Sequence, residues 1–286
     1  MTEFQAIRER MTPVTWAQSL FLLALLPLVA LADEPAGKED AERKERLEFM
    51  KQQAAAYEIT LSDSKSTKLT LHDEPLLRFS NPVGGVPDGI VVMWKDGHRP
   101  AIFAQVFQTK GGLWVHECQS LATAGLAMRR GEEAKWKPEK SADDFRPLKN
   151  APAAAESAAK RLVQMKGLAA AFSATDDFKI SSQDKETTRH ELRLLPTPVY
   201  RYQDASAGIL DAAVFAFVHG TDPEVFLVLE NRDKEGWVYG LAPMTCWGVN
   251  VSHKGTEVWS VPERLGKSKI TDPYYVWGNR LSELGK

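Results

Sequence analysis

The chain has 286 residues, of which 36 are basic and 38 acidic, so its net charge at neutral pH is −2; hydrophobic residues make up 43% and charged residues 26%. This composition is that of an ordinary globular protein and excludes a collagen-like, a wholly disordered or a disulfide-stapled small protein. A nearly neutral chain also lacks the positive field that attracts nucleic acid or anionic membranes, so neither is expected as a partner.

The N-terminal residues have the pattern of a secretory signal peptide. Arg8 and Arg10 precede an apolar run from Leu20 to Ala32, which ends in Ala-Leu-Ala. The run is shorter than the roughly 20 residues that a membrane-spanning helix needs. We therefore expect a signal peptide over residues 1–32 that is cleaved after Ala32, export to the periplasm or the extracellular space, and a mature chain without a membrane span.

The next segments alternate between polar and apolar patterns. Residues 33–46 are almost all polar and indicate a linker that leads into a helix, whose apolar side chains recur with helical spacing from residue 47 to Tyr57. Strand patterns separated by Asp-Gly and Gly-Gly turns follow up to residue 128. Residues 129–159 are charged and then rich in Ala and Pro, which indicates a connection over the surface.

The second half begins with another helical pattern. A helix is predicted over residues 160–172, and a polar connection that contains Asp176 and Asp177 follows it. Strand patterns then continue. The sequence predicts a last hairpin around residues 254–255 and an irregular end through Trp277.

The two halves resemble each other. When Leu71 is laid on Leu194, glycines, prolines and a tryptophan of both halves coincide without a gap. This repeat predicts an α+β fold, an internal duplication of a helix plus a four- or five-stranded antiparallel meander with pseudo-twofold symmetry. The repeat units are expected over residues 47–128 and 160–286, the second with a C-terminal hairpin. The sheets of the two units form one long sheet or face each other.

A residue type that recurs in both halves is better explained by folding than by a single site. The matched pairs are Arg78 and Arg201, Asp88 and Asp211, and Trp114 and Trp237. The charged residues are expected to pair within their own half or to cap turns, and the two tryptophans to lie in the core. Trp136, in the charged connection, is the best candidate for an exposed tryptophan.

Catalytic and cofactor motifs give no assignment. His116 and Cys118 share one strand face, an arrangement that is more often sheet packing than an activated thiol. Cys118 and Cys246 permit one disulfide in an oxidising compartment and equally two separate thiols. The six histidines show no paired metal-binding spacing, and no glycine-rich loop precedes a helix. The sequence therefore predicts no metal and no cofactor.

The turn from His219 to Glu224 is the most distinctive local string. His219, Asp222 and Glu224 offer nitrogen and oxygen atoms to a ligand, although Asp-Pro between two strands is more simply explained as turn chemistry. The corresponding turn of the first half carries His98 and Arg99 instead. Because a site is expected where the halves differ, His219, Asp222 and Glu224 are the candidate ligand-binding residues.

Four strings resemble a family of exported bacterial proteins of the planctomycete type. They are PLLRFSNPV (75–83), RLVQMKGLAAAF (161–172), LRLLPTPVYRY (192–202) and HGTDPEVFLVLE (219–230). The resemblance covers about residues 68–280 and implies export and a shared fold, without an activity or a catalytic residue. We expect an exported, non-catalytic module that binds a ligand, an envelope protein or a polysaccharide. The alternative is a hydrolase-like envelope enzyme with acidic or His side chains from positions at which the halves differ.

Overall fold

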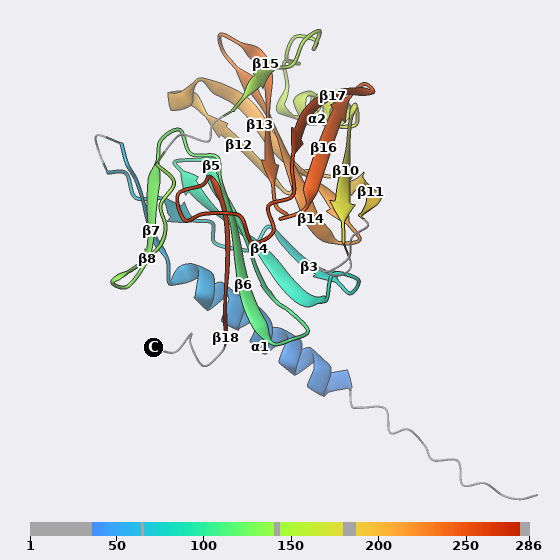
Figure 1. Cartoon of the computed structure of the whole chain (residues 1–286). Coiled ribbons are helices and arrows are strands. Elements are labelled where there is room, and N and C mark those ends of the chain that lie inside the picture. Colours follow the sequence, from blue (N-terminus) through green and yellow to red (C-terminus); the bar gives the residue numbers. More distant parts are fainter. Residues whose placement is uncertain (1–35, 64–65, 140–143, 180–186, 281–286) are drawn as a thin grey trace, which may run out of the picture.

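The computed structural model describes residues 36–63, 66–139, 144–179 and 187–280, which form two α-helices, one short 3₁₀ turn and eighteen strands (Figure 1). The helices are α1 (Ala36–Ala55) and α2 (Ala158–Ala169), and the 3₁₀ turn is η1 (Ala205–Ala207). Within the described ranges, neither helix combines the length and the hydrophobicity that crossing a membrane requires.

Two of the three antiparallel sheets are built mainly from the first half of the chain. The small sheet has the strand order β1 (Glu58–Leu61), β7 (Leu126–Arg130) and β8 (Glu133–Trp136). The six-stranded sheet has the order β18 (Tyr274–Arg280), β6 (Leu113–Ser120), β5 (Arg99–Gln108), β4 (Val86–Asp96) and β2 (Thr70–Leu71), with β3 (Leu77–Asn81) also paired with β4.

The third sheet has nine strands and contains the candidate site. Its order is β17 (Thr256–Val261), β16 (Gly248–His253), β10 (Phe172–Phe178), β11 (Thr188–Leu194), β13 (Ile209–His219), β14 (Asp222–Arg232), β15 (Gly236–Pro243) and β9 (Arg146–Pro147), with β12 (Tyr200–Asp204) also paired with β13.

The two large sheets face each other, and a helix packs on the outer face of each (Figure 1). The rings of Phe103 and Phe226 meet between the sheets, with centroids 4.5 Å apart. Met50 of α1 packs into the core behind the six-stranded sheet, and Met165 of α2 into the core behind the nine-stranded one. Because both faces of β4 and β13 are covered, these strands are continuous hydrophobic runs rather than alternating ones.

An aspartate that binds two arginines ties each helix to its sheet. Asp88 accepts hydrogen bonds from Arg46 of α1 and from Arg78 of β3, at 3.0 and 2.8 Å. The three residues of the second cluster repeat this arrangement, since Asp211 accepts from Arg161 of α2 and Arg201 of β12 at 2.7 and 2.9 Å. The expected pairing of these recurring charged residues within each half is confirmed.

The expected α+β fold made of two helix-plus-meander copies is wrong. Of the described residues, 52% lie in strands and 14% in helices, and the large sheets are curled. The two large sheets are also unequal, because β18 from the end of the chain joins the first one, while β10, β11, β16 and β17 extend the second. The sequence misled because several of these strands are short or polar, so their patterns indicated connections.

Several element boundaries differ from the predicted ones. Helix α1 begins at Ala36, inside the segment that was expected to be a linker, and β8 and β9 lie within the expected connection over residues 129–159. Helix α2 ends at Ala169, and Phe172 already begins β10. The hairpin around residues 254–255 is confirmed by the pairing of β16 with β17. The expected signal peptide, residues 1–32, lies outside the described residues.

The predictions for the tryptophans were partly right. Trp114 and Trp237 are buried, as expected. Trp136 is fully buried rather than exposed, and its Nε1 donates a hydrogen bond to the carbonyl oxygen of Asp272 at 2.8 Å. Its partner segment comes from the other end of the chain, and no local pattern around residue 136 indicates it.

Candidate functional site

A tight turn and an irregularity in strand pairing position the residues that the sequence singled out. His219 ends β13 and Asp222 begins β14, and the two residues pair across the turn. Phe217 pairs with Val225 and Val218 with Pro223, so Glu224 has no partner of its own on β13. Such an extra residue in one strand is a bulge, which changes the direction of nearby side chains. Glu224 lies beside His219 at this irregularity.

Asp176 of β10 completes a cluster with these two residues. One ligand atom each of Asp176, His219 and Glu224 lies within 4.8 Å of the others. The His219 Nδ1 atom is 3.2 Å from Asp176 Oδ2. The Asp176 side chain is fully buried, and its Oδ1 atom has no hydrogen-bond partner among the described residues. A buried carboxylate oxygen without a partner is unusual and requires an explanation.

Asp222 lies next to this cluster but faces the other sheet. Its Oδ2 atom accepts a hydrogen bond from Asn81 Nδ2 at 3.1 Å, and its Oδ1 atom accepts one from Gln105 Nε2 at 3.3 Å. Both of its oxygens are therefore in use. Of the three residues proposed from the sequence, His219 and Glu224 join the cluster, and Asp222 links the two sheets.

The site is acidic and poorly solvated. Burial raises the pKa of Asp222 to about 8, against the hydrogen bond from Asn81, and raises the pKa of the nearby Glu117 to about 7, against the hydrogen bond from Tyr274. Burial and the charge of Asp222 raise the pKa of Glu224 well above its ordinary value, and burial also raises the pKa of Asp176. Each carboxylate thus lacks part of the positive charge or solvent that would stabilise it.

His116 and Cys118 lie away from the cluster, whereas Cys246 is close enough to Glu224 for their charges to interact. His116 and Cys118 share the face of β6 that is buried under α1, where burial lowers the pKa of His116 to about 3 and raises the pKa of Cys118. This is sheet packing rather than an activated thiol. Cys246 is near Glu117, which points to the opposite face of β6 from Cys118. Both cysteines are free, so the disulfide that the sequence permitted is not formed.

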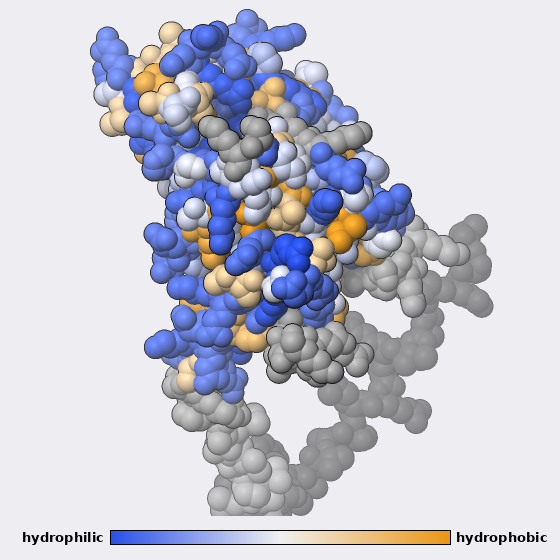
Figure 2. Space-filling model, turned by 90° about the vertical axis from the view of Figure 1, so that its left-hand side faces the viewer, coloured by the Kyte–Doolittle hydropathy of each residue, from blue (hydrophilic) through white to orange (hydrophobic). Residues whose placement is uncertain are grey.

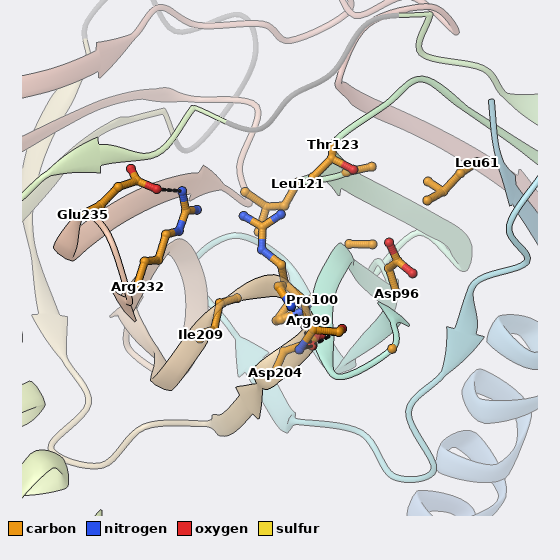
Figure 3. Close-up of a pocket in the computed structure, with 15 residues that line it drawn as sticks. Leu61, Asp96, Arg99, Pro100, Leu121, Thr123, Asp204, Ile209, Arg232 and Glu235 are labelled. Carbon is orange, nitrogen blue, oxygen red and sulfur yellow. Dashed lines mark hydrogen bonds and ion pairs between the residues drawn. The ribbon is translucent and has the colours of Figure 1, made fainter. Parts of the chain in front are cut away.

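A solvent-accessible pocket of about 380 Å³ opens between other parts of the two sheets (Figure 3). Its wall includes Arg99 and Arg232, which both bind the buried Glu230, at 2.8 and 2.6 Å. Arg232 also pairs with Glu235 at 3.3 Å, and both guanidinium groups stack on the ring of Phe145. Arg99 of β5 thus links the two sheets through Glu230 of β14, and none of the cluster residues lines this pocket.

The missed member of the cluster, Asp176, carries a signal in the sequence. Phe172, Ala174 and Phe178 alternate with polar residues, and Asp176 occupies the position between Ala174 and Phe178 on the same buried face.

No protein-family model matches the chain, and neither does a curated protein or a solved structure.

Proposed function

We propose that this protein binds a divalent metal ion through Asp176, His219 and Glu224, and that it acts as an exported, non-catalytic binding protein. The observation that carries the proposal is the fully buried Oδ1 atom of Asp176, which has no hydrogen-bond partner among the described residues and lies beside the two other potential ligands.

The electrostatics of the site support a cation. Burying ionised carboxylates without countercharges costs several kcal/mol per group, and a bound divalent cation offsets that cost and restores the charged forms. An imidazole nitrogen combined with carboxylate oxygens is a ligand set that suits zinc and related transition metals. The three residues come from β10, β13 and β14, so binding would also link three strands of the nine-stranded sheet.

A binding role fits this site better than the hydrolase-like alternative. The raised carboxyl pKa values would suit general acid chemistry. However, Asp176 and Glu224 are buried, and the pocket of Figure 3 is lined by neither of them nor by His219.

On the face shown in Figure 2, hydrophilic residues predominate and hydrophobic ones are scattered, which favours a small ligand over a large apolar partner on that face. We propose an envelope protein or a polysaccharide as a further partner.

Export is proposed on the N-terminal pattern alone. The basic residues, the short apolar run and the Ala-Leu-Ala that ends at Ala32 support a periplasmic or extracellular location after cleavage. In such a compartment the metal would come from the surroundings of the cell.

The test is a titration of the chelator-treated protein with Zn²⁺, Mn²⁺ and Ca²⁺ by calorimetry, with a metal count by mass spectrometry. We expect one ion per chain, and at least a tenfold weaker affinity in Asp176→Asn, His219→Ala and Glu224→Gln, because the loss even of indirect contacts costs about tenfold or more. Asp177→Asn is the matched control, because the partly exposed Asp177 binds Arg189 at 2.9 Å instead. A wild-type protein that binds none of the three ions, or a control as weak as the three variants, would overturn the proposal.

A further inference from the structure

His190 of β11 lies beside the proposed metal site. It pairs directly with Asp176 across β10 and β11, so the two side chains project from the same face of the sheet. Its ring centroid is 4.7 Å from that of His219, and the two rings are tilted by 41°. Both rings form T-shaped pairs with Phe178, whose ring centroid is 6.1 Å from that of His190 and 5.4 Å from that of His219. The two imidazoles are thus held next to each other and next to the buried carboxylate.

We propose that His190 is the fourth ligand of this site, and that the site is therefore selective for a transition metal of the zinc type over calcium. This inference rests on the proposed function. It adds the residue that completes the site and the class of ion that the site prefers.

The spacing of the rings supports a shared ion. Zinc binds imidazole nitrogen at 2.0–2.1 Å with tetrahedral angles, which places the centres of two imidazoles on one ion about 5 Å apart. The observed separation of 4.7 Å between the rings of His190 and His219 is close to that value. Two imidazoles and two carboxylates also form a complete tetrahedral set. Calcium takes six to eight oxygen ligands instead, which this group of residues does not supply.

His190 also gives the site a route to solvent. Asp176 and Glu224 are buried, whereas His190 is half-buried and the His219 side chain is 19% exposed. An ion therefore reaches the carboxylates from the side of the two histidines. A purely structural His190 would require only a ring of similar size at this position.

Metal titrations of His190 variants distinguish a ligand role of this residue from a purely structural one. The chelator-treated wild type, His190→Ala and His190→Phe are titrated with Zn²⁺, Ca²⁺ and Co²⁺, and the visible absorption of bound Co²⁺ reports its coordination. Phenylalanine keeps a ring against Phe178 but has no ligand atom. His253→Ala is the matched control, because His253 lies in the same sheet and its ring packs on Phe172 instead, with centroids 4.6 Å apart. Thermal unfolding without metal verifies that each variant is folded.

We expect the wild type to bind Zn²⁺ more tightly than Ca²⁺. Both His190 variants should bind Zn²⁺ at least about tenfold more weakly and give an altered Co²⁺ spectrum, whereas His253→Ala should match the wild type. If the wild type binds Zn²⁺ through Asp176, His219 and Glu224 while both His190 variants retain its affinity and spectrum, the inference is wrong and the proposed function stands. If the wild type binds no metal, both are wrong.

Discussion

Asp176 and Asp177 are neighbours in the chain with opposite surroundings. Asp177 is partly exposed and binds Arg189, whereas Asp176 is fully buried beside His219. Alternation along a strand separates them, since successive side chains point to opposite faces. The alternation of Phe172, Ala174 and Phe178 indicates a strand with Asp176 on its buried face, but the polar residues between them led to the prediction of a connection. The sequence thus carried the alternation that indicates the burial of Asp176, but the neighbouring polar residues outweighed it.

Replacing Asp176 by Asn should separate stability from function. Without metal, Asp176→Asn removes a buried negative charge that the described structure leaves only partly compensated, so the free energy of unfolding should rise by about 1 kcal/mol. The same variant should lose the stabilisation that added Zn²⁺ gives the wild type, which amounts to about 2.7 kcal/mol at a hundredfold excess over Kd.

Urea unfolding with and without Zn²⁺ measures both effects. The matched control, Asp177→Asn, should stay within about 0.5 kcal/mol of the wild type in each condition, because an exposed ion pair contributes little. A metal-free Asp176→Asn protein that is less stable than the wild type would show that the carboxylate is compensated by groups of the protein itself.

At the scale of elements, sequence patterns succeeded where pairing is local. The hairpin of β16 and β17 turns at Lys254 and Gly255, which both have positive φ, and a glycine there is the usual sign of such a turn. Strand β18 was missed because its partner β6 lies in the first half of the chain, where Tyr274 pairs with Gln119. Pairing of this kind depends on the whole fold, and the residues around Tyr274 carry no trace of it.

The two aspartates that tie the helices to the sheets differ in burial, which gives a graded prediction. The Asp211 side chain is fully buried and its partner Arg161 is 8% exposed, whereas Asp88 is 7% exposed and its partner Arg46 is 33% exposed. Removing one partner of a buried pair costs about 3 kcal/mol or more. We therefore expect Asp211→Asn to lower the free energy of unfolding by about 3 kcal/mol and Asp88→Asn to lower it by clearly less.

The ion pairs of Asp211 should also shape the way in which the free energy of unfolding falls at acid pH. Burial alone would raise the pKa of Asp211, but the hydrogen bonds from Arg201 and Arg161 outweigh it and lower the pKa. The unfolded chain therefore takes up the proton first. The ionised Asp211 therefore contributes its full stabilisation of the folded protein above the pKa of about 3.9 that an aspartate has in the unfolded chain. This stabilisation is lost as the pH falls from there through the lower pKa of Asp211 in the folded protein. Urea unfolding between pH 2 and 7 should give a shallower acid limb for Asp211→Asn than for the wild type. An unchanged limb would contradict the prediction.

At the scale of the molecule, polar contacts cross the interface between the two large sheets at places far apart in the sequence. Asp222 of β14 reaches Asn81 and Gln105 of the six-stranded sheet beside the candidate metal site. Arg99 of β5 reaches Glu230 of β14 beside the pocket of Figure 3. The recurrence of residues between the halves correctly indicated the pairs within each sheet. These contacts between the sheets use positions at which the halves differ, so recurrence gave no sign of them.

Glu230 provides the sharpest test of this interface. Its side chain is fully buried and accepts hydrogen bonds from Arg99, Arg232 and Tyr202 at 2.8, 2.6 and 2.6 Å. Glu230→Gln keeps the shape of the side chain but takes the carboxylate away from two largely buried guanidinium groups, so the free energy of unfolding should fall by about 3 kcal/mol. Glu235→Gln is the matched control, because Glu235 binds the same Arg232 from a half-exposed position and should change stability by less than about 0.5 kcal/mol. Urea unfolding at neutral pH measures both variants. Equal losses in the two would mean that burial of Glu230 does not strengthen the link, and that the apolar contact around Phe103 and Phe226 holds the sheets together without it.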